Sequence, residues 1–107
     1  NMSLADTTTI LITSEFVRTP SFNLARGTDH WQAASAIVMG KGVIDNTVIG
    51  ATLADATVAG WDGAQRVALN SDTMLLPEHL TASVLSGIGF SDAANAISAK
   101  PMRGLFK

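Results

Sequence analysis

Four side chains that can take part in metal, acid–base or anion chemistry lie near the start of the chain. Glu15, Arg18, Asp29 and His30 belong to one polar stretch that follows the apolar run 10–12. Carboxylate oxygens bind zinc, magnesium and calcium, and neutral imidazole is a common metal ligand. The planar guanidinium group of arginine suits an anionic ester. These residue types therefore indicate a site for a metal ion or an anion.

The elements around this stretch predict that it lies at the edge of a sheet. The run 10–12 is aliphatic without alternation, which predicts a strand buried on both faces, as in a parallel sheet. Glu15 follows this strand closely, and the ligands of open α/β sheets gather beyond the carboxyl ends of the strands. The polar loop continues to residue 31, and loops longer than about 12 residues are often functional.

Each candidate residue also has a structural interpretation. Glu15 can pair with Arg18 or accept hydrogen bonds from the loop backbone, and bracing the loop against Glu15 is the favoured role for Arg18. Asp29 and His30 fit an Asx-type turn that carries a surface histidine. His79 is expected to be solvated on a helix.

Three motifs resemble the closing third of a bacterial protein family. They are S-E-F-x-R-T-P over residues 14–20, D-H-W over 29–31 and V-I-G-A-T over 48–52. The family is domain of unknown function 1501, whose members are exported proteins of the alkaline phosphatase and sulfatase superfamily. The resemblance extends from residue 4 through the final helices. It implies a periplasmic or exported location.

The resemblance also implies roles for the candidate residues. Glu15 and His30 would be ligands of a divalent metal ion (zinc, magnesium or calcium) in the full-length parent protein. Asp29 would be a further ligand or would orient a nearby imidazole, and Arg18 would bind the anion in the catalytic site. The implied activity is metal-dependent hydrolysis of a sulfate or phosphate ester. Because these ligands are too few for a two-metal site, this chain alone is expected to bind no metal or to bind it weakly.

Departures from the family pattern favour an alternative function. Val17 stands where the first motif has glycine, and Leu53 stands where an aspartate usually follows V-I-G-A-T. The upstream part of the family pattern, which would supply the nucleophile and most metal ligands, has no counterpart here. The alternative is a non-catalytic exported module that keeps the superfamily fold for binding or assembly.

The composition is that of globular material. The 107 residues form one domain or part of one, with 47% hydrophobic and 15% charged residues. A net charge of −2 with seven Lys and Arg residues argues against a nucleic-acid surface. No apolar run approaches the roughly 18 residues that cross a bilayer, and no signal peptide is recognisable. The absence of cysteine excludes disulfides and thiolate chemistry.

Further elements follow from local patterns. Residues 33–39 suit a strand closely covered by a helix, or a helix with one tight face, and the resemblance favours the strand. Gly40 to Gly42 predict a tight turn, because Val43 follows where a phosphate-binding loop has Ser or Thr. Turn residues at 45–47 join two short extended pieces. Residues 50–72 are predicted to be mostly loop with short strands.

Two helices are predicted near the end of the chain. The first begins at Pro77, since proline suits the first helical position, and ends at Gly87 and Gly89. The second covers residues 93–99 and ends before Pro101. The first helix has an apolar stripe of residues spaced four apart: Leu76, Leu80, Val84 and Ile88.

We therefore expect an α/β fold: the C-terminal part of an alkaline-phosphatase-like parallel or mixed sheet flanked by helices. Residues 1–107 would form a single partial domain. A strand that is apolar on both faces needs layers above and below and neighbours at each edge. The chain is therefore expected to form a homo-oligomer or to pack against the missing upstream part of the parent domain.

Overall fold

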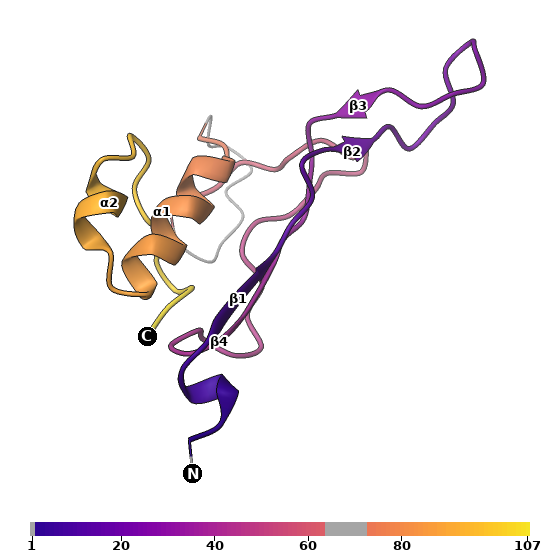
Figure 1. Cartoon of the computed structure of the whole chain (residues 1–107). Helices are drawn as coiled ribbons and strands as arrows, with labels where there is room; N and C mark the ends of the chain where they lie inside the picture. Colours follow the sequence, from indigo (N-terminus) through magenta and orange to yellow (C-terminus); the bar gives the residue numbers. More distant parts are fainter. Residues whose placement is uncertain (1, 64–72) are drawn as a thin grey trace.

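The computed structural model describes residues 2–63 and 73–107. An extended β arm projects away from a pair of helices (Figure 1). The radius of gyration is 15.7 Å, against about 13 Å for a compact domain of this length, so the molecule is elongated. The elements are η1 (Leu4–Asp6), β1 (Thr9–Ile12), β2 (Val17–Arg18), β3 (His30–Trp31), β4 (Ile37–Gly40), α1 (Pro77–Gly87) and α2 (Ser91–Asn95).

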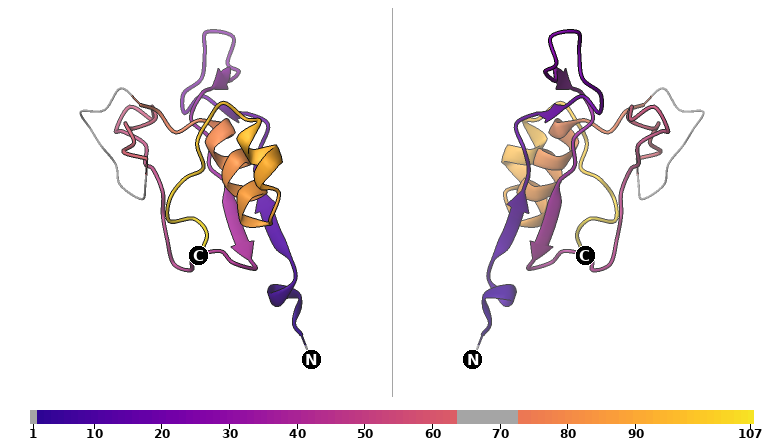
Figure 2. Two further views of the ribbon diagram at one scale, coloured as in Figure 1. Left: turned by 90° about the vertical axis from the view of Figure 1, so that its left-hand side faces the viewer. Right: turned by 90° about the vertical axis from the view of Figure 1, so that its right-hand side faces the viewer.

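The arm is one long antiparallel hairpin interrupted in its middle. β1 pairs with β4, with Thr9 opposite Gly40, and β2 pairs with β3. The loop 19–29 forms the tip, which lies far from the N-terminus in both views of Figure 2. The expected strands at 10–12 and 33–39 are therefore present, the second one as Ile37–Gly40, and the fold is mixed α/β. Both described sheets are two-stranded and antiparallel.

The prediction that the run 10–12 is buried on both faces is wrong for this chain. A two-stranded ribbon has no neighbour to extend it, and no layer of the described residues covers it. The helices pack against each other instead. The apolar side chains of β1 and β4 are consequently exposed to solvent: Ile10 (46%), Leu11 (39%), Ile12 (51%), Ile37 (56%) and Met39 (42%).

Local turns follow the sequence closely. Gly40 has φ 105°, and a β-carbon at this position would overlap the carbonyl oxygen of Thr8. The Lys41 N–H donates to that same oxygen at 2.8 Å, which extends the β1–β4 pairing. The Val43 N–H donates to the Gly40 carbonyl oxygen at 3.2 Å, which closes the tight turn. The predicted turn at 45–47 is present, with Asn46 in the left-handed region at φ 54°. Residues 50–72 were predicted to be mostly loop with short strands. Residues 50–63 form isolated β-bridges, and residues 64–72 lie outside the described residues.

α1 begins at Pro77 and ends at Gly87, as predicted. α2 spans Ser91–Asn95, so the expected 93–99 helix starts earlier and is shorter. None of the described helices is long and apolar enough to cross a membrane.

The buried face of α1 differs from the predicted stripe. Leu80 and Val84 of the stripe are half-buried, but Leu76 and Ile88 are exposed. Ala82 and Ser83 are buried instead. Small residues occupy this face because α2 and the C-terminal segment approach α1 closely. Among the described residues, the buried apolar side chains are few and several are small: Val43, Ala59, Trp61, Ala82, Ala94 and Met102.

Ser83 ties the C-terminal segment to α1. Its hydroxyl donates to the His79 carbonyl oxygen at 2.6 Å and accepts the Met102 N–H at 2.6 Å. Beyond Met102 the chain pairs with residues 42–44, where Ile44 N–H donates to the Leu105 carbonyl oxygen. The Ser83 hydroxyl therefore satisfies a buried backbone donor at the centre of the helical part.

Replacing Ser83 by alanine should lower the free energy of unfolding by about 1–3 kcal/mol, because the Met102 N–H would stay buried without its acceptor. Urea denaturation measures the difference. Ser86→Ala, exposed on the same helix, is the control and should change stability by less than about 0.5 kcal/mol. Equal stability of the two variants would contradict the assignment.

Candidate functional site

The structure brings Arg18 and His30 together at the outer part of the arm. They are directly opposite each other in the β2–β3 ladder. Both side chains contact the ring of Phe16: the His30 ring stacks on it at 4.1 Å with an interplanar angle of 20°, and the Arg18 Cζ atom lies 4.7 Å from its centroid. Arg18 and His30 are exposed, and Phe16 is half-buried. We call these three residues the Phe16 cluster.

Arg18 also braces its own loop. Its Nη1 atom donates to the Thr28 carbonyl oxygen at 3.1 Å across the hairpin. Glu15 is exposed in the bend that precedes Phe16. Arg18 therefore braces the loop through the Thr28 carbonyl oxygen, whereas the partner expected from the sequence was Glu15.

Asp29 lies next to His30 in sequence, yet its carboxylate belongs to the loop. Its Oδ1 atom accepts a hydrogen bond from the Asn23 side-chain amide at 3.0 Å. Its backbone N–H donates to the Thr19 hydroxyl at 3.2 Å. Neighbouring residues of an extended chain point to opposite faces, so the carboxylate and the imidazole diverge. Within residues 2–63 and 73–107, no group of three or more His, Cys, Asp or Glu side chains is placed to hold a metal ion.

Asn23 organises the tip loop, and the sequence analysis missed it. Its side-chain oxygen accepts the backbone N–H groups of Ala25 and Gly27, each at 3.0 Å. Its backbone N–H donates to the Gly27 carbonyl oxygen at 2.8 Å. Asparagine commonly bonds to the backbone a few residues onward, so Asn23 followed by Gly27 was the available signal. The long loop is therefore an ordered turn.

The other face of the β2–β3 ribbon docks on the rest of the chain. Trp31 is half-buried, and its indole Nε1 donates to the Ala56 carbonyl oxygen at 2.7 Å. Val17, opposite Trp31 in the ladder, is also half-buried. Because side chains alternate between the faces of a strand, docking through Val17 and Trp31 leaves Arg18 and His30 on the outer face.

A small hairpin presents the Ala56 carbonyl group. The Leu53 N–H donates to the Thr57 carbonyl oxygen at 2.8 Å, and Ala56 itself is left-handed at φ 63°. The Thr57 hydroxyl and N–H donate to the Asp55 carboxylate at 2.6 and 3.1 Å. These hydrogen bonds hold the pKa of Asp55 below its ordinary value. The stabilisation from these hydrogen bonds is therefore present at pH values above the pKa that Asp55 has in the unfolded chain. It is lost as the pH falls through the lowered pKa of Asp55 in the folded chain.

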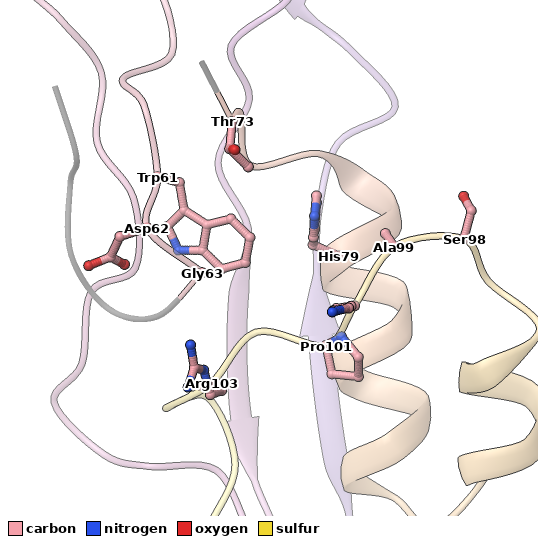
Figure 3. Close-up of a pocket in the computed structure, with 10 residues that line it drawn as sticks. Trp61, Asp62, Gly63, Thr73, His79, Ser98, Ala99, Pro101 and Arg103 are labelled. Atoms are coloured by element: carbon pink, nitrogen blue, oxygen red, sulfur yellow. The ribbon is translucent and has the colours of Figure 1, made fainter. Parts of the chain in front are cut away.

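The sequence suggested that His79 is a solvated surface histidine. In the structure it is not. Its Nδ1 atom accepts the Leu76 N–H at 3.1 Å, which satisfies a free donor at the start of α1. Its ring meets the Trp61 ring edge-on at 4.9 Å. Both rings line an open hollow, together with Thr73, Pro101 and Arg103 among others (Figure 3). His79 is half-buried there and serves as a cap of the helix.

Comparison with known proteins identifies the family. No curated protein and no solved structure matches the chain. A family model matches residues 1–82, which include both strands of each sheet and the Phe16 cluster. The chain therefore belongs to the family described as Protein of unknown function (DUF1501).

Proposed function

We propose that the chain forms one wall of a hydrolytic site in a larger, exported protein with an alkaline-phosphatase-like parallel or mixed sheet. The parent would hydrolyse sulfate or phosphate esters with the help of a divalent metal ion such as zinc, magnesium or calcium. The observation that carries this proposal is the pairing of Arg18 and His30, both exposed, on the ring of Phe16. The S-E-F-x-R-T-P and D-H-W motifs supply these residues.

Each residue has a role in the proposed site. Glu15 and His30 would be metal ligands supplied by this wall, and Arg18 would bind the anionic ester through its planar fork. Asp29 would join them as a ligand only after releasing the Asn23 amide, so its contribution in the present geometry is to hold the loop.

The second candidate is a non-catalytic module that uses the same fold for binding or assembly. The hydrogen bonds of Arg18 and Asp29 favour it, since both run within the hairpin loop. Val17 adds support, because it replaces the glycine of the motif and is half-buried on the docked face of the β2–β3 ribbon.

The hydrolytic proposal predicts large losses of activity at two positions. In a longer family member that contains this chain, Glu15→Gln and His30→Ala should each lower turnover of aryl sulfates or phosphates at least about 100-fold, since even groups behind the ligands contribute about 10- to 100-fold. Melting temperatures should change little because both side chains are exposed. Glu78→Gln, also exposed, is the control. Unchanged turnover in both variants would favour the non-catalytic candidate.

The exposed apolar side chains of β1 and β4 underlie a proposal about partners. At about 25 cal/mol per Å² of apolar surface, covering several of them yields several kcal/mol, which is comparable with the stability of a small domain. We propose that this ribbon is covered by a second copy of the chain or, in the parent, by its upstream part.

The isolated chain should therefore form a dimer or a larger assembly. Light scattering after size exclusion, carried to low micromolar concentration, measures the mass. Ile12→Thr, exposed in the ribbon at the end of β1, should weaken the assembly, whereas Val48→Thr, exposed outside the ribbon, should leave it unchanged. A stable, compact monomer at all concentrations would rule out assembly through this ribbon.

A further inference from the structure

The outer face of the β2–β3 ribbon presents hydrogen-bond donors from two side chains. The Arg18 guanidinium donates one N–H group to the Thr28 carbonyl oxygen and carries several more N–H groups. The His30 imidazole lies opposite it in the ladder. Both groups are exposed, so a ligand from solvent can reach them together.

The carboxylate closest in sequence to His30 is directed elsewhere. Asp29 accepts the Asn23 amide within the tip loop, and strand alternation places it on the face opposite His30. Asn23 is itself fixed by accepting two loop N–H groups. The loop therefore separates the negative charge of Asp29 from the donors, which reduces the repulsion that an anion would meet there.

Phe16 gives the two donor groups a common support. Arginine has many rotamers, and fixing them costs binding free energy when a ligand arrives. Contact of the guanidinium with the Phe16 ring, and stacking of the imidazole on that ring, restrict both groups before binding. The ring is half-buried, so it is a steadier support than an exposed side chain.

We infer that the Phe16 cluster is an oxyanion-binding subsite for a sulfate or phosphate group, and that Phe16 is its positioning residue. The ester class rests on the proposed function, but binding of the oxyanion requires neither a metal ion nor hydrolysis. Arg18 contributes its planar fork to the oxygens of the tetrahedral anion, and His30 contributes a ring N–H.

The test is a nuclear magnetic resonance titration of the 107-residue chain with sodium sulfate and inorganic phosphate. Sodium chloride at matched ionic strength controls for screening. The signals followed are the His30 ring protons and the Arg18 Nε–H. In the native chain these signals should move in a saturable manner with sulfate and phosphate and stay in place with chloride.

The Phe16 variants separate positioning from general stability. Phe16→Ala should shift the His30 ring protons in the free protein, because the neighbouring ring current is lost. It should also weaken anion binding at least about threefold, as expected for the loss of such ring contacts. Phe16→Tyr should restore both properties. The Trp31 indole signal reports that the ribbon remains docked, and Phe16→Leu takes the place of Phe16→Ala if that signal is lost.

The outcomes of this titration can be distinguished from a failure of the proposed ester hydrolysis. Saturable binding that depends on Phe16 supports the subsite even when the parent proves inactive on esters. Identical responses to chloride and sulfate, or binding that is unaffected by Phe16→Ala with the ribbon still docked, would overturn the inference, whatever the parent hydrolyses.

Discussion

The hydrogen bond from the Trp31 indole to the Ala56 carbonyl oxygen decides which face of the β2–β3 ribbon meets solvent. In a two-stranded ribbon the side chains alternate strictly, so fixing one face also fixes the other. With Trp31 and Val17 turned inward, Arg18 and His30 turn outward and share the Phe16 ring. The contact at 2.7 Å therefore connects a small hairpin around Ala56 to the chemistry proposed for the opposite face.

The two parts of the molecule differ in how they are stabilised. The helical part closes around small buried residues, where the Ser83 hydroxyl satisfies the Met102 backbone. The β1–β4 ribbon depends on its ladder of backbone hydrogen bonds and leaves most of its aliphatic side chains exposed. An exposed aliphatic ribbon is costly in water and prone to association. The partner proposal and the hydrolytic proposal thus share one observation: within residues 2–63 and 73–107, no layer covers the β1–β4 ribbon.

Local signals in the sequence predicted local structure well. Pro77 marked the start of α1, and turn residues marked the bends near Gly40 and Asn46. Strand pairing and side-chain burial were harder to predict from the sequence, because they depend on which segments of the chain meet. The aliphatic residues 10–12 form a strand, but its antiparallel partner is a later part of the same arm, so periodicity alone misjudged their exposure.

The candidate site was predicted in part for the same reason. Residue type and motif selected Arg18 and His30, which the structure places together. Phe16 was missed because an aromatic residue beside polar ones is usually assigned to the core, and its role here depends on cross-strand stacking. His79 was misjudged because a histidine at the third helical position acts as a cap only when its ring turns back to the Leu76 N–H.

Hydrogen exchange at the Trp31 indole N–H tests the docked orientation most directly. If Trp31 is docked, its indole N–H should exchange at least about fivefold more slowly than the indole N–H of free tryptophan, in line with a net hydrogen-bond contribution of about 1 kcal/mol. The Trp31 signal is assigned by comparison with a Trp31→Phe variant. Exchange at the rate of free indole would show that Trp31 is undocked, and the outward placement of Arg18 and His30 would then lose its physical basis.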